Sequence, residues 1–538
     1  MKIKYVTVAE MQAIEREADA QGHTYAQMME FAGRGLAQVV QEEFGYLADE
    51  GALGLVGSGN NGGDTLVALA YLAEDGWKAS AALLRPRPTN DPLITRLERA
   101  GGKIYFPDGT PDLEALSKLL DEHAVLLDGL LGTGFRLPLK GELARALGFV
   151  KHLVETKEKP PIVVAVDCPS GVDCDSGEAA PECIPADVTV TMAAIKQGLF
   201  KFPAYRLIGE LHTVDIGLPQ EGESLAAWRA ARSFVPDAAW VRQILPPRPP
   251  DAHKGTFGTC LVIAGSVNYT GAAYLAGQAA YRVGAGLVTL AVPSPLHAAL
   301  AGQFPEATWA ALPHQNGFIA AEACDAVVET MQRATAVLIG PGFGLERATQ
   351  LFLERLLSHF STAGGSLPSA WVADADGLKL LARLPDWATR LPSPAVLTPH
   401  PGEMSVLTGL TKDEIQADRL TIARRFSQEW GHVVTLKGAF TVVAAPDGEA
   451  AIIPVATPAL ARAGTGDVLA GLIAGLRAQG VPAFQAAVAG AWIHAVAGLR
   501  AADEIGNTAS VLAGDVLKAC IQIISDLESE DKNKYHPR

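Results

Sequence analysis

Short apolar runs alternate with amphipathic stretches along the first part of the chain. The apolar runs, which predict strands, lie at 53–56, 80–84, 125–127, 162–166 and 188–191. The stretches between them, such as 64–74 and 141–153, have the spacing of helices. Strands and helices that alternate in this way form a parallel sheet with helices on both faces. The pattern therefore predicts a three-layer α/β/α domain.

The same alternation begins again after a proline-rich segment at 246–250. Its apolar runs lie at 261–264, 287–292, 336–339, 371–374, 395–398, 433–436 and 441–444. Three long helical patterns follow, and a charged tail ends the chain. We therefore predict an α/β fold of two three-layer α/β/α domains, at 1–230 and 231–528. We expect residues 529–538 to be disordered.

Composition narrows the class of protein. Of the 538 residues, 49% are hydrophobic and 19% charged, which excludes a disordered or fibrous chain. The formal charge of -15 argues against a partner nucleic acid, because affinity for it comes from neutralising phosphates. No apolar stretch approaches the length of about 18 residues that a membrane helix needs, and the start has no signal-peptide pattern. Six cysteines are too few in a chain of this length for a disulfide scaffold. Together, these observations lead us to expect a cytoplasmic protein with no membrane partner.

The first half carries a glycine-rich loop, GSGNNGGD at 57–64, between a predicted strand and a predicted helix. Such a turn can bring backbone NH groups close to a phosphate at the helix start. Two more polar loops follow strands, DGLLGTG at 128–134 and DCPSG at 167–171. Because parallel strands end at the same edge of a sheet, the three loops should meet in one crevice. Each aspartate alone could also be a helix cap or an Asx turn.

These loops resemble the signature loops of the NAD(P)H-hydrate epimerase family, over roughly residues 1–220. The resemblance implies a Rossmann-like fold, with Asp167 as a catalytic group at the nicotinamide end. It implies that the hydrated nucleotide binds at Asn60, Asn61, Gly62, Gly63, Asp64, Gly132, Thr133, Gly134, Phe135, Arg136, Leu137, Pro138 and Asp167. It also implies a potassium ion held by Asn61, Asp128 and Ser170, whose oxygen donors suit a hard cation. Thr65 and Cys168 depart from the family pattern, and Thr65 could narrow the loop.

The second half carries AGTGD at 463–467, directly before a predicted helix. Successive NH groups of this loop can point at one anion while Asp467 takes a proton from a hydroxyl, as phosphoryl transfer requires. Lys437 to Thr441, between two strands, offers a cation to a nucleotide phosphate. His400 lies between two prolines in a loop that follows a strand, where it could be structural or could reach a ligand.

Together, HKGTFG, GPGFG, DADGL, LTPHPGE and AGTGD resemble the ADP-dependent NAD(P)H-hydrate dehydratase family, a branch of the ribokinase-like fold. The resemblance implies that the hydrated nucleotide lies at Gly342, His400 and the catalytic Asp467, with the segment around Ala272 closing over it. It implies that ADP binds at Lys437, Gly438, Ala439, Phe440, Thr441 and Gly466. Leu460, Ala461 and Arg462 replace a usually smaller, more polar approach to the loop.

The two resemblances imply a bifunctional enzyme that repairs hydrated NADH and NADPH. The first domain would interconvert the R and S hydrates, and the second would dehydrate the S form with ADP and Mg²⁺, releasing AMP and phosphate. K⁺ would serve the first site, and a homo-oligomer of four or eight copies is expected. Two alternatives remain open: a vitamin or sugar kinase with a regulatory first domain, and a scaffold of the kind found in RNA-decapping assemblies.

Overall fold

The computed structural model describes residues 2–219, 224–362 and 368–529, so most of the predicted tail at 529–538 lies outside the described residues. The chain divides into a first compact unit over Ile3–Phe234 and a second that begins at Val235. Among the described residues, no helix is long and apolar enough to cross a membrane.

The first unit contains a parallel sheet in the order β4-β3-β2-β5-β6-β7-β9. The strands are β2 (Ala52–Val56), β3 (Ala79–Leu83), β4 (Lys103–Tyr105), β5 (Val125–Gly129), β6 (Ile162–Val166), β7 (Val188–Met192) and β9 (Glu210–Val214). The chain builds outward from β2 to β4, then returns to the other side of β2 with β5. This reversal makes a topological switch point between β2 and β5, the place where open α/β sheets bind dinucleotides.

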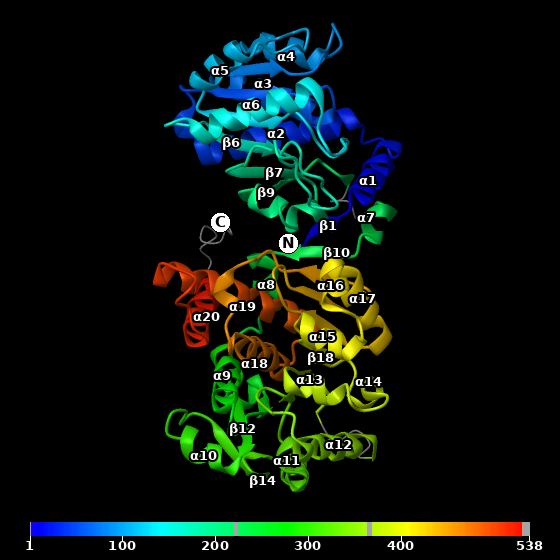
Figure 1. Cartoon of the computed structure of the whole chain (residues 1–538), viewed down its shortest axis with the longest axis vertical. Coiled ribbons are helices and arrows are strands. Elements are labelled where there is room, and N and C mark those ends of the chain that lie inside the picture. Colours follow the sequence, from blue (N-terminus) through cyan, green and yellow to red (C-terminus); the bar gives the residue numbers. More distant parts are fainter. Residues whose placement is uncertain (1, 220–223, 363–367, 530–538) are drawn as a thin grey trace. The chain divides into compact units, whose positions relative to one another are not determined.

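Helices cover both faces of this sheet (Figure 1). They are α1 (Val8–Ala20), α2 (Tyr25–Phe44), α3 (Asn60–Glu74), α4 (Pro92–Arg99), α5 (Leu113–Asp121) and α6 (Gly141–Thr156). Side chains of β2 alternate between the faces, because Ala52 and Val56 pack with α1 to α4 while Leu53 and Leu55 pack with α5 and α6. The predicted three-layer arrangement is confirmed for this unit.

The second unit has a mixed sheet that contains the order β13-β12-β11-β16-β17-β18-β19-β20-β21. These strands are β13 (Thr308–Leu312), β12 (Leu287–Pro293), β11 (Thr259–Ile263), β16 (Ala336–Ile339), β17 (Ala370–Ala373), β18 (Val396–Leu397), β19 (Val433–Leu436), β20 (Val442–Ala444) and β21 (Ala450–Ile452). Pairing is parallel as far as β19 and antiparallel from there to β21. The parallel part places the loops that follow β16, β17, β18 and β19 along one edge.

Helices also cover both faces of the second sheet. The main ones are α9 (Thr270–Arg282), α11 (Cys324–Met331), α12 (Arg347–Thr362), α13 (Asp376–Leu381), α15 (Pro401–Thr408), α17 (Arg419–Trp430), α18 (Thr465–Ala478), α19 (Ala483–Ile505) and α20 (Ala513–Glu528). The apolar side chains of α11 and α12 pack on Leu261 and Ile263 of β11. Helix α18 packs on α9, β16 and β17, which places the predicted anion loop at its start beside the strand ends.

Candidate active sites

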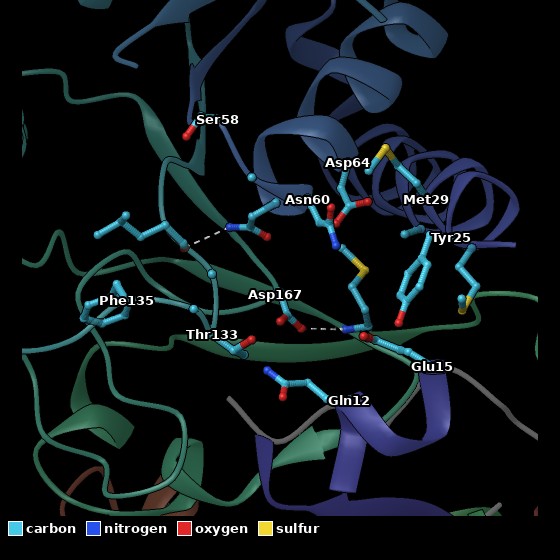
Figure 2. Close-up of a pocket in the computed structure, with 18 of the residues that line it drawn as sticks. Gln12, Glu15, Tyr25, Met29, Ser58, Asn60, Asp64, Thr133, Phe135 and Asp167 are labelled. Atoms are coloured by element: carbon cyan, nitrogen blue, oxygen red, sulfur yellow. Dashed lines mark hydrogen bonds between the residues drawn. The ribbon is translucent and has the colours of Figure 1, made fainter. Parts of the chain in front are cut away.

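The first unit contains a cavity of about 780 Å³ at the switch point. It is walled by the loops after β2, β5 and β6 and by helices α1 and α2, as Figure 2 shows. The predicted residues that line it are Asn60, Asn61, Asp64, Gly132, Thr133, Gly134, Phe135 and Asp167. The three polar loops therefore meet in one cavity. Arg136, Leu137 and Pro138 are not among its lining residues.

The glycine-rich loop supplies the start of α3, whose N-cap is Gly59. A side chain on Gly62 would lie 2.1 Å from the carbonyl oxygen of Gly57, and one on Gly63 would lie 2.6 Å from Met29. Neither glycine lines the cavity, but both let the first turn of α3 pack closely against the loop and α2. Its free NH groups therefore lie where a phosphate can bind.

Asp167 is held in an unusual conformation at the end of β6. Its φ of 63° lies in the left-handed region, which non-glycine residues rarely adopt. Its Oδ1 accepts hydrogen bonds from Thr191 Oγ1 and the Met192 backbone NH, both at 3.1 Å. The same oxygen forms an ion pair with Lys196, whose side chain is only 2% exposed (Figure 2). This buried pair fixes a carboxylate and an ammonium group at one end of the cavity.

Two more carboxyl groups lie near that pair. Burial raises the pKa of Asp64 well above its usual value, and the charges of Asp167 and Glu15 raise it further. Burial also raises the pKa of Glu15, against the opposing effect of Lys196. Both shifts favour the protonated acid, so the cavity places two potential proton donors beside the Asp167–Lys196 pair.

The three predicted ion ligands form a connected group below the cavity. Ser170 donates to Asp128 from Oγ at 2.6 Å and from its backbone NH at 2.8 Å. The side-chain amide of Asn61 donates to the Leu131 carbonyl at 2.9 Å, while Leu131 NH donates to Ser170 Oγ at 2.9 Å. Burial raises the pKa of the fully buried Asp128. No side-chain cation pairs with Asp128 in the described part of the chain, and the donor set is oxygen only, so these residues fit a bound K⁺.

In the second unit, the anion loop is shaped by Gly464, whose φ is 91°. A side chain there would lie 2.9 Å from Leu275 of α9, so the loop packs directly on that helix. One turn earlier, α9 contacts the loop after β16, because a side chain on Gly342 would lie 2.9 Å from the Ala272 methyl group. Helix α9 thus joins the predicted residues Ala272 and Gly342 to the anion loop.

A charged cluster lies beside this loop. Lys437 pairs with Asp374 at 2.6 Å and approaches Glu403 at 3.7 Å. Thr398 Oγ1 also donates to Asp374 at 2.7 Å. A side chain on Gly466 would lie 3.5 Å from Lys437 Nζ, so the lysine reaches the start of α18.

The ionisation of Asp467 reflects this cluster. Burial raises the pKa of Asp467 to about 7, and the negative charge of Asp374 contributes to the rise while Lys437 opposes it. A general base works best with a pKa near the operating pH. Burial alone would raise the pKa of Glu403, but the hydrogen bond from His400 and the charge of Lys437 lower it to about 2. The pKa values of Asp467 and Glu403 therefore differ strongly, and Asp467 is the group that can exchange a proton near neutral pH.

His400 caps helix α15. Its Nδ1 accepts from the backbone NH groups of Gly402 at 2.9 Å and Glu403 at 3.2 Å, and its Nε2 lies 3.2 Å from Glu403 Oε1. The accepting Nδ1 places the ring proton on Nε2, which donates to the carboxylate. Half of the side chain is exposed, so the ring can offer a face to a ligand while both nitrogens are engaged.

Comparison with known proteins identifies the family of each half of the chain. Residues 260–522 match the family model described as NAD(P)H-hydrate dehydratase, and residues 25–198 match the model described as YjeF-related protein N-terminus. The bifunctional NAD(P)H-hydrate repair enzyme Nnr of Moorella thermoacetica is 38% identical over 98% of this chain and 97% of its own. The chain belongs to the family of bifunctional NAD(P)H-hydrate repair enzymes.

Other members of this family are also similar along nearly the whole chain. The enzyme from Escherichia coli is 33% identical over 96% of this chain and 93% of its own. Among solved structures, the ADP/ATP-dependent NAD(P)H-hydrate dehydratase of Bacillus subtilis, co-crystallised with ATP and Mg²⁺, is 28% identical. It covers 54% of this chain and 98% of its own, with a TM-score of 0.45.

Thr65 and Arg462, two of the departures from the repair-enzyme pattern, have partners close by. Thr65 donates from Oγ1 to the Asn61 carbonyl at 2.8 Å and is fully buried. A side chain on Gly129 would lie 1.8 Å from Thr65 Oγ1, and one on Gly54 would lie 2.7 Å from the Thr65 methyl group. The two glycines make room for Thr65 below α3. Arg462 donates to the carbonyl of Ala509.

Sequence reasoning missed the partners of the predicted residues. Lys196 follows no motif, and its side chain reaches Asp167 only because Ile195–Lys196 forms β8 beside β1 (Lys2–Val6). Glu15 and Tyr25 line the cavity from α1 and α2, which the sequence showed only as helices. In the second unit, the DADGL and LTPHPGE motifs were recognised, but the contact of Asp374 and Glu403 with Lys437 was not.

Proposed function

We propose that the first unit interconverts the R and S hydrates of NADH and NADPH and that the second unit dehydrates the S form at the expense of ADP. The observation that carries this proposal is that one chain contains two separate groups of the predicted residues, each with a carboxyl group whose pKa is raised. One has a buried acid and base at the end of a dinucleotide-sized cavity, and the other has an anion loop beside a carboxyl group with a pKa of about 7.

In the first site, epimerisation requires the C6 hydroxyl to leave and water to return to the opposite face. Protonated Asp64 gives its proton to the departing hydroxyl, which leaves as water, and the ring nitrogen supplies electrons to C6. Asp167 then takes a proton from the water that adds to the other face. The ion pair with Lys196 orients Asp167 for this step.

Potassium would be held by Asn61, Asp128 and Ser170, with the Leu131 carbonyl beside them. When bound, the ion supplies positive charge next to the loop that carries the nucleotide phosphates. Burial raises the pKa of the Asp128 carboxyl group when no ion is bound. A potassium ion would favour the charged carboxylate, and that charge would offset the cost of removing the ion from water.

In the second site, Asp467 takes the proton of the C6 hydroxyl as that oxygen attacks the β-phosphate of ADP. The NH groups at the start of α18 and Lys437 stabilise the transferred charge. Gly438 to Thr441 and Gly466 hold the nucleotide, and Mg²⁺ neutralises its phosphate oxygens when bound. The phosphorylated hydroxyl then leaves C6 as phosphate, a far better leaving group than hydroxide. C5 loses a proton to the departing phosphate as the ring double bond forms, and the reduced nicotinamide and AMP remain.

We also propose that 1–230 and 231–528 act as separate catalytic domains. The proposed residues of each reaction lie within one unit, so neither reaction needs a group from the other. An assembly of four or eight copies in the cytoplasm stays a prediction.

The test supplies a mixture of R and S hydrates together with ADP or ATP and follows the return of reduced-nicotinamide absorbance. We expect complete conversion of both epimers with ADP, because epimerisation feeds the S form. Asp128→Ala should leave the S form convertible while the R form persists. A kinase would instead accumulate a phosphorylated product without restoring the absorbance.

A further inference from the structure

Arg85 lines the cavity from the loop after β3, and β3 lies on the other side of β2 from β6, the strand that Asp167 follows. Strands β2 and β3 are parallel neighbours that end in register, with Val56 beside Leu83. The Leu84 NH donates to the Val56 carbonyl at 3.0 Å, which extends this register by one residue. Arg85 therefore follows β3 at the level where Gly57 and Ser58 follow β2, and it lines the cavity beside Ser58 and Gly59.

The nearby Arg87 has a different environment. Arg87 pairs with Asp91 at 2.7 Å and donates to the Gly57 carbonyl at 2.7 Å, with 8% of its side chain exposed. It therefore braces the glycine-rich loop. Arg85 is exposed, and it makes no hydrogen bond or ion pair within residues 2–219, 224–362 and 368–529. Arg16 of α1, the other arginine that lines the cavity, follows Glu15 directly, and its charge opposes the rise in the pKa of Glu15. Arg85 is therefore the lining guanidinium group that the loop after β3 supplies.

Among the described residues that line the cavity, the loop after β3 supplies Arg85 and no carboxylate to bind a ribose diol. The carboxyl groups that line the cavity, Glu15, Asp64 and Asp167, influence one another and Lys196. Asp91 is committed to Arg87 and to the NH of Leu93 at the start of α4. Asp91, the first acidic residue after Arg85 in the sequence, is therefore not free to bind a ribose.

The sheet order gives the direction of the bound nucleotide. Counted from β2, the first six strands have the order 3-2-1-4-5-6 of dinucleotide-binding folds, with the pyrophosphate at the helix after the first strand. If the nicotinamide end lies at Asp167 after β6, the adenosine lies beyond β3. About 20 residues past the glycine-rich loop, such folds place a carboxylate that binds the 2′-hydroxyl of NAD or an arginine that binds the 2′-phosphate of NADP.

We propose that Arg85 binds the 2′-phosphate of hydrated NADPH and makes the first unit prefer it to hydrated NADH. This inference rests on the proposed epimerase function. A guanidinium group can form two parallel hydrogen bonds with a phosphate, and it gains nothing comparable from a 2′-hydroxyl.

The experiment measures epimerisation of each purified hydrate by the full chain without ADP, with the epimers separated by chromatography. We expect kcat/KM for hydrated NADPH to exceed that for hydrated NADH by roughly 10- to 100-fold, the worth of a charge-assisted pair. Arg85→Ala should remove this preference and leave kcat/KM for hydrated NADH within about twofold. Arg85→Lys should keep part of it, because a lysine retains the charge without the paired donors.

Arg99→Ala is the matched control, because Arg99 is an exposed arginine in the last turn of α4 that does not line the cavity. It should preserve the preference. Equal loss with both hydrates in Arg85→Ala would show that Arg85 contacts a part common to both nucleotides, and would overturn the inference. So would equal use of both hydrates by the unaltered chain.

A binding measurement separates this inference from the proposed reaction. Titration of ADP-ribose and of 2′-phospho-ADP-ribose into the unaltered chain and Arg85→Ala should show a loss of affinity for the phosphorylated probe alone. Such a loss in a chain that epimerises neither hydrate would contradict the proposed epimerase and support the role of Arg85. No difference between the two proteins would contradict that role even in an active epimerase.

Discussion

Replacement of Asp467 by asparagine should lower dehydration and raise the stability of the second unit at the same time. Asparagine keeps the shape at the start of α18 but cannot take a proton. Loss of general-base catalysis predicts a decrease in kcat of about 100- to 10,000-fold. In the unaltered chain, dehydration should fall about tenfold per pH unit below pH 7, because protonation of Asp467 removes the base. This pH dependence should disappear in the variant.

The stability effect follows from the same pKa. A change in the pKa of Asp467 from 3.8 to about 7 on folding corresponds to at most about 4 kcal/mol. Because the folded pKa is the higher one, ionisation weakens the folded state. This penalty is absent below pH 3.8, grows as the pH rises to about 7 and is complete above it. Asp467→Asn should therefore be the more stable protein at pH 8, with a smaller difference at pH 5.

The assay is urea unfolding at the two pH values, read on the transition that ADP shifts, since a ligand stabilises the unit to which it binds. Asp503→Asn removes an exposed carboxylate of α19 as a control and should change neither stability nor activity. Near-normal dehydration by Asp467→Asn, with its pH dependence retained, would refute the assignment of the base. Reduced activity with reduced stability at pH 8 would show instead that the substitution damages the fold.

Three further experiments test whether each reaction belongs to one domain and which residues of the first domain take part. Residues 1–230 expressed alone should equilibrate the epimers without a nucleotide, as measured by chromatography, and a need for ADP would contradict separate domains. Asp128→Ala should weaken epimerisation and its response to added KCl, and an unchanged response would remove Asp128 from the ion site. Lys196→Met should lower epimerisation by about 100-fold or more while ADP-dependent dehydration of the S hydrate stays normal, because the loss of Lys196 leaves Asp167 without its partner. A normal epimerisation rate in that variant would exclude Lys196 from the reaction.

The fold and the loops could be predicted because their signals are local. Apolar runs bounded by glycine and polar residues indicated the strands, and the Rossmann-like and ribokinase-like architectures implied by the two sets of motifs are confirmed. The loop at 57–64 could be placed at a helix start from its own composition. In each case, a few consecutive residues determine the backbone.

The ionisable pairs could not be predicted because they depend on register between distant segments. Lys196 reaches Asp167 across 29 positions of sequence, and Lys437 reaches Asp374 across 63. Nothing near Lys437 in the sequence shows that it pairs with Asp374, so the sequence indicated a cation for ADP without its carboxylate partner. His400 shows the opposite case, since its role as a helix cap follows from Glu403 three residues later, a spacing visible in the sequence.

The two units obtain opposite proton chemistry from the same kind of sheet edge. In the first, Asp64 is buried near two other acids, so the protonated form is favoured and the group can donate a proton. In the second, Lys437 opposes the rise in the pKa of Asp467 and holds it near 7, so the carboxyl group can accept one. In both sites burial and neighbouring carboxylates raise the pKa of the aspartate, and one lysine, Lys196 or Lys437, opposes the rise. The balance of these effects therefore sets the form in which each group begins the reaction.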